Sequence, residues 1–442
     1  MERLSRGKRI VFTALTGILA LLLVEFVSWL AFTAMDSEPF SFQGLSAERQ
    51  LVMDKGDVDE NAFESFERAS RGIEGEVVHP FLGFVHSPDD QETHRLMERF
   101  QVGISEYGFF VPSQFSETPS PEAYRVGIFG GSVAMALSNY GDLLVSVLKQ
   151  SPTLADQEIV VINFAMGGYK QPQQLMVLSY FLSLGERLDM VINLDGFNEV
   201  ALPFVENVPN GVFPFYPRAW RIRAGHLPDL PAQRCAGRID HLYEKRADHA
   251  KRFEAWPWRR SVTCNLFWKG LDRRLAVTQQ AMREEMVERL SGERSFFLNG
   301  PAYSYDSEEE LFHDLAAMWM RGSVQMHRLC QGNGIAYYHF LQPNQYVPDS
   351  KPMGREERTA SYCEDHKYRE PVKKGYPHLM VGGERLVRQG VPFRDLSMVF
   401  AEVPEKIYED PCCHFNRLGY SLVVDAMANL ILEDLDSQEP LQ

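Results

Sequence analysis

Apolar and amphipathic stretches alternate along the chain from about residue 121 onward. Four short runs are almost continuously apolar, at 124–129 (YRVGIF), 158–164 (EIVVINF), 189–195 (DMVINLD) and 335–341 (IAYYHFL). Stretches with helical spacing follow these runs, at 134–149, 175–184, 308–330 and 418–435. Strands that are apolar on both faces and alternate with helices predict an α/β fold, in which helices cover both faces of a central parallel sheet.

This rhythm is interrupted between about residues 201 and 305. The segment carries NVPNGVFPFYPRAW and then two basic helical stretches, so we interpret it as an insertion that could cap a site. We therefore expect a main domain at 121–442 with this insertion, preceded at 35–120 by a polar stalk and a flanking segment of short strands and turns. Four aromatic residues of the insertion either form a platform for an acyl or sugar group or attach the insertion to the domain: Phe213, Phe215, Tyr216 and Trp220.

Residues 10–34 are predominantly apolar and carry a single charged residue, Glu25. About 20 apolar residues in a helix cross a bilayer, so we expect one retained transmembrane anchor. A cleaved signal peptide, whose apolar core is usually shorter, is the alternative. Basic residues precede the span within 1–9, and Asp36 and Glu38 follow it. The positive-inside rule then predicts a single-pass protein of the inner membrane, with residues 1–9 in the cytoplasm and the rest in the periplasm. We expect Glu25 to snorkel or to pair with another helix.

Composition narrows the range of partners. The chain has 442 residues, with 45 Lys and Arg against 60 Asp and Glu, and a formal net charge of −15. This acidity and the absence of a long basic run make nucleic acid an unexpected partner. Six cysteines permit disulfides in an exported domain without revealing their pairing, and their spacing matches no zinc motif. They are Cys235, Cys264, Cys330, Cys363, Cys412 and Cys413.

Polar and glycine-rich turns follow the first three predicted strands, and in a parallel sheet these turns meet at one edge. The first turn, GIFGGSVA, places Ser132 at the start of a helix, where backbone N–H groups favour a developing anion. The second turn (NFAMGGY) contains Gly168, and the third (DGFNE) contains Asn198. The segment DPCCHFNRLGY adds Asp410 and His414 just before the last helix. A serine, a histidine base and several N–H donors are the parts of a serine hydrolase site, which needs no metal or organic cofactor.

These four segments resemble the blocks of the SGNH (GDSL-like) hydrolases, in the order of that family. The blocks are Gly130-Gly131-Ser132-Val133, Asn163 to Gly168, Gly196-Phe197-Asn198-Glu199, and Asp410 with His414. The resemblance implies a flavodoxin-like three-layer α/β/α fold and a membrane-anchored bacterial type. It also implies a catalytic triad of Ser132, His414 and Asp410, and an oxyanion hole formed by Ser132, Gly168 and Asn198.

The chain departs from the family pattern at three positions. Gly131 and Glu199 replace aspartates, which changes little. More important, three residues separate Asp410 from His414 where the family usually has two. A local bulge could absorb the extra residue; otherwise Asp395 or a backbone carbonyl would orient the imidazole. Gln342 and Asn344, after the fourth strand, could also reach the site.

The expected function is a serine esterase that cleaves an acyl ester, for example an acetyl ester, through an acyl-serine intermediate. The location suggests an acetylated polysaccharide, a lipid or a peptidoglycan derivative as the substrate. An O-acyltransferase acting on an envelope glycan would use the same residues, and a non-catalytic scaffold that binds glycan or a membrane partner is the third alternative. A nucleotide-binding Rossmann-like domain is disfavoured because G-x-G-x-x-G is missing.

Overall fold

The computed structural model describes residues 6–35, 40–53, 75–112, 120–224, 230–291 and 296–437. The chain forms two compact units. One, which we call the helical unit, comprises Met1–Ser70 and Gly225–Glu293; the other, the α/β unit, comprises Arg71–Ala224 and Arg294–Gln442. The segment expected as one insertion is therefore divided, since its first and last parts belong to the α/β unit.

The α/β unit is built on a five-stranded sheet with the order β6-β5-β7-β8-β9. The strands are β5 (Tyr124–Gly130), β6 (Ile159–Asn163), β7 (Met190–Asp195), β8 (Ala336–Leu341) and β9 (Phe393–Asp395). All neighbouring strands run parallel. The order 2-1-3-4-5 is that of flavodoxin-like folds, in which ligands bind at the carboxyl edge of the strands.

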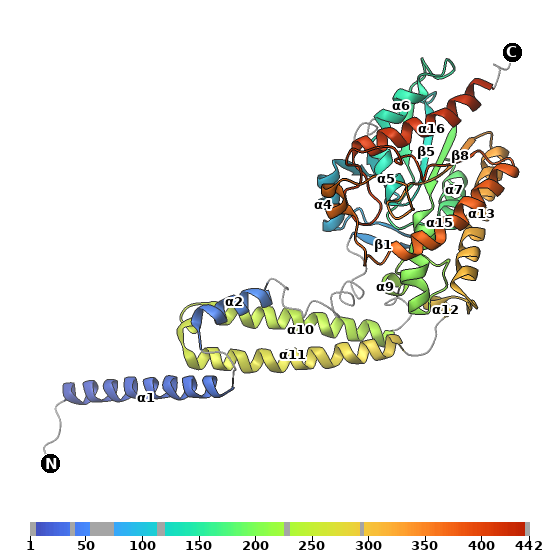
Figure 1. Ribbon diagram of the computed structural model, residues 1–442. Coiled ribbons are helices and arrows are strands. Elements are labelled where there is room, and N and C mark those ends of the chain that lie inside the picture. The colour runs from blue at the N-terminus through green and yellow to red at the C-terminus, as the bar shows by residue number, and fades with distance from the viewer. Residues whose placement is uncertain are drawn as a thin grey trace. The chain divides into compact units, whose positions relative to one another are not determined.

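Helices cover both faces of this sheet, which confirms the predicted three-layer α/β/α fold (Figure 1). One layer contains α5 (Ser132–Asn139), α6 (Gly141–Leu148) and α16 (Arg417–Ser437). The other contains α7 (Gln173–Ser183), α13 (Glu308–Gly332) and α15 (Arg369–Arg388). The helix predicted at 134–149 is two helices, because the first ends at Asn139 and the second begins at Gly141.

The core lies between the sheet and the two helical layers. The central strand residues Val126, Ile128, Val191 and Ile192 are all fully buried, as their apolar runs predict. The flanking segment packs against the same core through two hairpins, and Tyr169 donates a hydrogen bond of 2.5 Å to the Phe84 carbonyl. Its elements are β1 (Glu76–His79), β2 (Gly83–His86), α4 (Gln91–Phe100), β3 (Val102–Ile104) and β4 (Phe110–Pro112).

Short helices occupy the connections of the α/β unit. Buried helix α8 (Phe197–Leu202) follows β7 and continues into a π-helical turn, Pro203–Asn207, and a 3-10 turn, Val208–Asn210. The remaining short helices are α9 (Trp220–Ala224), α12 (Phe296–Asn299) and α14 (Arg355–Ser361). The aromatic residues of the insertion pack on one another, since Phe213 lies edge to face with both Phe215 and Tyr216. Their packing supports an attachment role rather than a binding platform.

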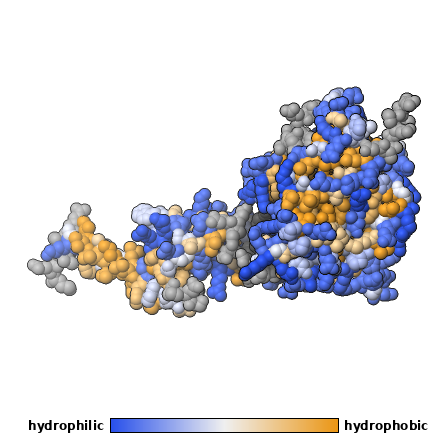
Figure 2. Space-filling view, turned by 45° about the horizontal axis from the view of Figure 1, so that its top comes forward, coloured by the Kyte–Doolittle hydropathy of each residue, from blue (hydrophilic) through white to orange (hydrophobic). Residues whose placement is uncertain are grey.

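The helical unit contains α1 (Arg6–Met35), α2 (Phe42–Met53), α10 (Leu230–Glu254) and α11 (Val262–Ser291). A 3-10 turn, Trp258–Arg260, joins α10 to α11. Arg49 of α2 links α10 to α11. Its side chain donates hydrogen bonds to Glu254 of α10 at 2.7 Å and to Asn265 of α11 at 2.6 Å. Within α1, Ile10–Ala34 is long and apolar enough to cross a membrane, and Figure 2 shows its apolar surface.

Candidate active site

The first turn at the carboxyl edge of the sheet presents Ser132 as the first residue of α5, directly after β5. Gly131 precedes it, and a Cβ atom at this position would lie 2.2 Å from Nδ2 of Asn198. Only glycine permits this close approach of the first and third turns. The turn therefore places the backbone next to Ser132 against the Asn198 amide.

Ser132, His414 and Asp410 form one hydrogen-bonded chain. Nε2 of His414 lies 2.8 Å from Oγ of Ser132, and Nδ1 of His414 lies 2.5 Å from Oδ2 of Asp410. The side chains of His414 and Asp410 are 35% and 38% exposed, so a substrate and water can reach them. A hydroxyl, an imidazole and a carboxylate bonded in this order can act as a nucleophile, a base and a group that orients the base.

The extra residue between Asp410 and His414 is accommodated by the carboxylate itself. Oδ1 of Asp410 accepts the backbone N–H groups of Cys412 at 2.9 Å and Cys413 at 3.0 Å, which closes the turn. Its other oxygen, Oδ2, is left for the imidazole. Asp395, the alternative from the sequence, instead accepts the backbone N–H of Ser397 at the end of β9.

The loop after β8 holds this turn from the other side. Asn344, Gln345 and Tyr346 donate side-chain hydrogen bonds to the carbonyls of Cys412 (3.1 Å), Asp410 (2.9 Å) and Pro411 (2.9 Å). Of these three, the sequence pointed only to Asn344. Gln342 does not hold the turn in this way: its backbone carbonyl accepts the Tyr376 hydroxyl, and its side-chain nitrogen is buried without a partner among the described residues.

The three turns at this edge of the sheet carry the N–H donors that the sequence predicted, on Ser132, Gly168 and Asn198. Asn198 is 8% exposed, and its Nδ2 donates one hydrogen bond of 2.8 Å to the Tyr169 carbonyl. The second N–H of this amide is then available for another acceptor. Gly168 has φ of +82°, a conformation that favours glycine. Within the described residues, the backbone N–H groups of Ser132 and Gly168 donate to no protein acceptor. These groups are suited to a developing oxyanion.

Arg218 lies against Gly168, a contact that the sequence did not indicate. A Cβ atom on Gly168 would meet Cδ of Arg218 at 2.6 Å. Nε of Arg218 pairs with Glu206 at 3.0 Å, and Glu206 also receives the Tyr368 hydroxyl at 3.2 Å. The insertion thus contributes a cation next to one predicted oxyanion donor.

Electrostatics favour a charged Asp410 and a basic His414. Burial raises the pKa of Asp410, but the hydrogen bond and charge of His414 outweigh it and lower that pKa to about 2. Burial likewise lowers the pKa of His414, but the Asp410 hydrogen bond and charge raise it above its ordinary value of 6.5. An anionic partner thus makes the imidazole a better proton acceptor.

The buried carboxyl group of Glu199 joins the second and third turns. Oε1 of Glu199 accepts the backbone N–H of Gln171 at 3.1 Å and Nε2 of Gln174 at 2.9 Å, and Oε2 accepts the Gly196 N–H at 2.8 Å. Burial and the Asp195 carboxylate raise the pKa of Glu199. Nearby, Lys170 donates to the carbonyls of Pro214 and Tyr216, both at 2.6 Å, and burial lowers its pKa to about 7.

A second Ser–His–Asp series lies inside the core. Nδ1 of His339 is 2.7 Å from Oγ of Ser323, and its Nε2 is 2.8 Å from Oδ1 of Asp195. Asp195 also accepts the indole N–H of Trp319 at 2.6 Å. All of these residues are buried, so no substrate reaches them, and the network serves to join β7, β8 and α13.

Two cysteine thiols adjoin the triad. The sulfur atoms of Cys412 and Cys413 are 3.4 Å apart and do not form a disulfide. Cys264, Cys330 and Cys363 are also free, whereas the side chain of Cys235 lies outside the described residues. Cys412, Cys413 and His414 are close enough to share a metal ion. However, both imidazole nitrogens already have partners in Asp410 and Ser132.

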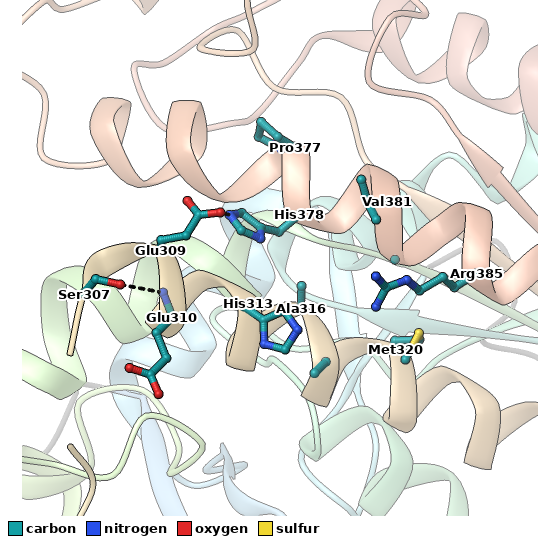
Figure 3. A pocket seen from close by; sticks show the side chains of 12 residues that line it. Ser307, Glu309, Glu310, His313, Ala316, Met320, Pro377, His378, Val381 and Arg385 are labelled. Atoms are coloured by element: carbon teal, nitrogen blue, oxygen red, sulfur yellow. Dashed lines mark hydrogen bonds and ion pairs between the residues drawn. The ribbon is translucent and has the colours of Figure 1, made fainter. Parts of the chain in front are cut away.

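A cavity of about 620 Å³ lies away from these residues (Figure 3). It lies between α13 and α15, and its lining includes Glu309, His313 and His378. His378 pairs with Glu309 at 3.4 Å. None of Ser132, Asp410 and His414 lines it.

Comparisons with known proteins give a limited result. No protein-family model matches the chain, and no curated protein matches it either. Among solved structures, a GDSL-like lipase from Bacteroides thetaiotaomicron aligns with 11% identity and a TM-score of 0.33, over 72% of this chain and 92% of that one. A lipase/acylhydrolase from Enterococcus faecalis aligns with 12% identity and a TM-score of 0.31, over 72% of this chain and 99% of that one.

Proposed function

We propose that the protein is an SGNH-type serine hydrolase that cleaves an acyl ester through an acyl-serine intermediate. One observation carries this proposal: the hydrogen-bonded chain from Ser132 through His414 to Asp410, at 2.8 and 2.5 Å, assembled from residues 282 positions apart. The order of the sheet and the four sequence blocks support the same reading.

In the proposed reaction, Oγ of Ser132 attacks the ester carbonyl and Nε2 of His414 takes its proton. The N–H groups of Ser132, Gly168 and Asn198 hold the oxyanion, each worth about 3–4 kcal/mol of transition-state stabilisation. The tetrahedral intermediate collapses, and the leaving alcohol receives the proton from His414. Water then attacks the acyl-serine, His414 accepts its proton, and the intermediate releases the acid and restores the Ser132 hydroxyl.

We also propose that α1 anchors the protein in the inner membrane, with residues 1–9 in the cytoplasm and the α/β unit on the periplasmic side. The apolar length of Ile10–Ala34 and the charges on either side of it support this placement. In this location an acetylated polysaccharide or a lipid of the cell envelope is the substrate class we favour. The open triad favours hydrolysis over transfer, because acyl transfer requires that water be excluded.

The test uses the full chain in detergent with a fluorophosphonate probe and p-nitrophenyl acetate. Wild type is compared with Ser132→Ala, His414→Ala and the control His313→Ala, whose side chain is 63% exposed on α13. The proposal expects labelling and turnover in wild type and His313→Ala, and loss of both in Ser132→Ala. Labelling with little turnover would favour the acyltransferase alternative. Labelling that persists in Ser132→Ala, or is absent from the wild type, would contradict the proposal.

A further inference from the structure

The turn that joins α10 to α11 exposes two large aromatic side chains. Trp256 is 76% exposed and Trp258 is 52% exposed, and Arg259 and Arg260 follow them directly. Exposing a tryptophan to water is unfavourable, whereas tryptophan is enriched at the membrane–water interface. The composition of this turn therefore points to a lipid surface.

The turn is attached to the apolar helix α1 at a defined level. Glu25 of α1 accepts the Ser261 hydroxyl at 2.6 Å and the Val262 backbone N–H at 2.5 Å, and Ser28 lies 2.9 Å from the Thr263 hydroxyl. Glu25 thus provides an acceptor for the first backbone N–H group of α11. Figure 1 shows the start of α11 beside the C-terminal half of α1.

The rise of a helix per residue gives the depth of Glu25, and of the turn bonded to it, in a bilayer. A helix rises about 1.5 Å per residue, so a hydrocarbon core of about 30 Å that begins at Ile10 ends near residue 30. Glu25 then lies about 7 Å inside the outer boundary of the hydrocarbon. The start of α11 is held at the same level, within the outer leaflet. There an unpaired N–H group would be costly, and the Glu25 carboxylate removes that cost.

We propose that the α10–α11 turn, residues 255–261, is a second membrane contact that inserts into the outer leaflet of an anionic phospholipid bilayer. Trp256 and Trp258 lie at the boundary between headgroups and acyl chains. Arg259 and Arg260 extend toward lipid phosphates, which suit the guanidinium group. The inference rests on the proposed membrane placement of α1 and is independent of the catalytic proposal.

The test is fluorescence quenching of the full chain in vesicles of phosphatidylcholine and phosphatidylglycerol whose acyl chains carry bromine at known depths. Bromine quenches only tryptophans that lie within the bilayer. The wild type is compared with Trp256→Phe/Trp258→Phe and with the control Trp220→Phe, whose indole bonds to the Phe297 carbonyl in the α/β unit. Both replaced residues of the double variant are exposed, so its fold should be retained, which circular dichroism checks.

We expect shallow bromines to quench the wild type and the control equally. The double variant should lose most of the quenchable emission, leaving the contributions of Trp29 in α1 and of Trp268, which is buried against Phe32 of α1. Quenching of the double variant equal to that of the wild type would place only α1 in the bilayer and overturn the inference. No quenching in any variant would also contradict the membrane placement of α1. Neither outcome bears on Ser132-dependent ester cleavage.

Discussion

His414 lies between a hydroxyl that it can deprotonate and a carboxylate that raises its pKa. A histidine acts as a general base only when it is neutral. The protonation state of this one imidazole should therefore set the acid limb of the pH–rate profile, and the charge of Asp410 should set its position.

We expect kcat/KM for p-nitrophenyl acetate to rise with pH, with a midpoint above the ordinary histidine value of 6.5. In Asp410→Asn the anion that stabilises the imidazolium is lost, so the midpoint should move to lower pH. The rate at the plateau should also fall, by about 10⁴-fold, because the imidazole is no longer held in the correct tautomer. A midpoint that does not move would show that Asp410 is not the partner of the base.

Asn198 is expected to act on the transition state rather than on substrate binding. Asn198→Ala removes the amide beside Gly131, so kcat should fall by roughly 10²–10³-fold with little change in KM. The control is Asn210→Ala, since Nδ2 of Asn210 only donates to the Glu206 carbonyl on the surface. A change in KM alone would mean that Asn198 binds the ground state.

At the scale of elements, the site depends on how neighbouring turns are joined. Glu199 at the start of α8 bonds the turn after β7 to the segment that leads into α7. The loop after β8 bonds the turn that carries Asp410. These bonds hold the turns that carry the proposed oxyanion donors and the proposed base. The bonds of Glu199 therefore offer a test of stability and activity together.

Glu199→Ala should lower the free energy of unfolding by about 3 kcal/mol, because three buried N–H donors lose their acceptor. It should also lower kcat, since Gly168 and Asn198 lose a common support. Chemical denaturation and esterase assays measure the two effects. The control Glu384→Ala removes an exposed pair with Arg388 and should change stability by less than about 0.5 kcal/mol. If the two variants lose equal amounts of stability and activity, the bonds of Glu199 do not stabilise the two turns.

At the scale of the whole molecule, the two units are interleaved in sequence. The chain leaves the α/β unit after α9 and returns at α12, and these short helices are bonded by Trp220 to the Phe297 carbonyl at 2.7 Å. The two ends of the excursion are thus close together. Folding of the α/β unit should not require the segment between them.

We expect that a chain beginning at residue 71, with 230–291 replaced by a short Gly/Ser linker, folds as a soluble protein. It should retain Ser132-dependent hydrolysis of p-nitrophenyl acetate within a few-fold of the full chain, because every residue of the proposed site lies in the α/β unit. Thermal unfolding and fluorophosphonate labelling provide the measurements. A labelled but inactive product would mean that the helical unit contributes to the reaction, and an unfolded one would mean that the units are interdependent.

The sequence by itself determined the class of fold and the turns of the site. Buried parallel strands are continuous apolar runs, so four of the five strands of the main sheet could be predicted. In a parallel α/β sheet the carboxyl ends of the strands lie at one edge, which brings the turns of the site together. Strand β9 was missed because it has three residues, two of them charged, and lies at the edge of the sheet. Ser132, Asp410 and His414 could be predicted as a set, and their catalytic roles remain a prediction.

Only the tertiary structure decided how the base is held. The sequence left Asp410, Asp395 and a backbone carbonyl open, since spacing alone does not show where a carboxylate oxygen points. The choice of Asp410 depends on its bonds to the turn and on support from the loop after β8, about 65 residues earlier. The same holds for Arg218 beside Gly168 and for Glu25 at the start of α11. Contacts between distant residues are set by packing and topology, which no local pattern in the chain records.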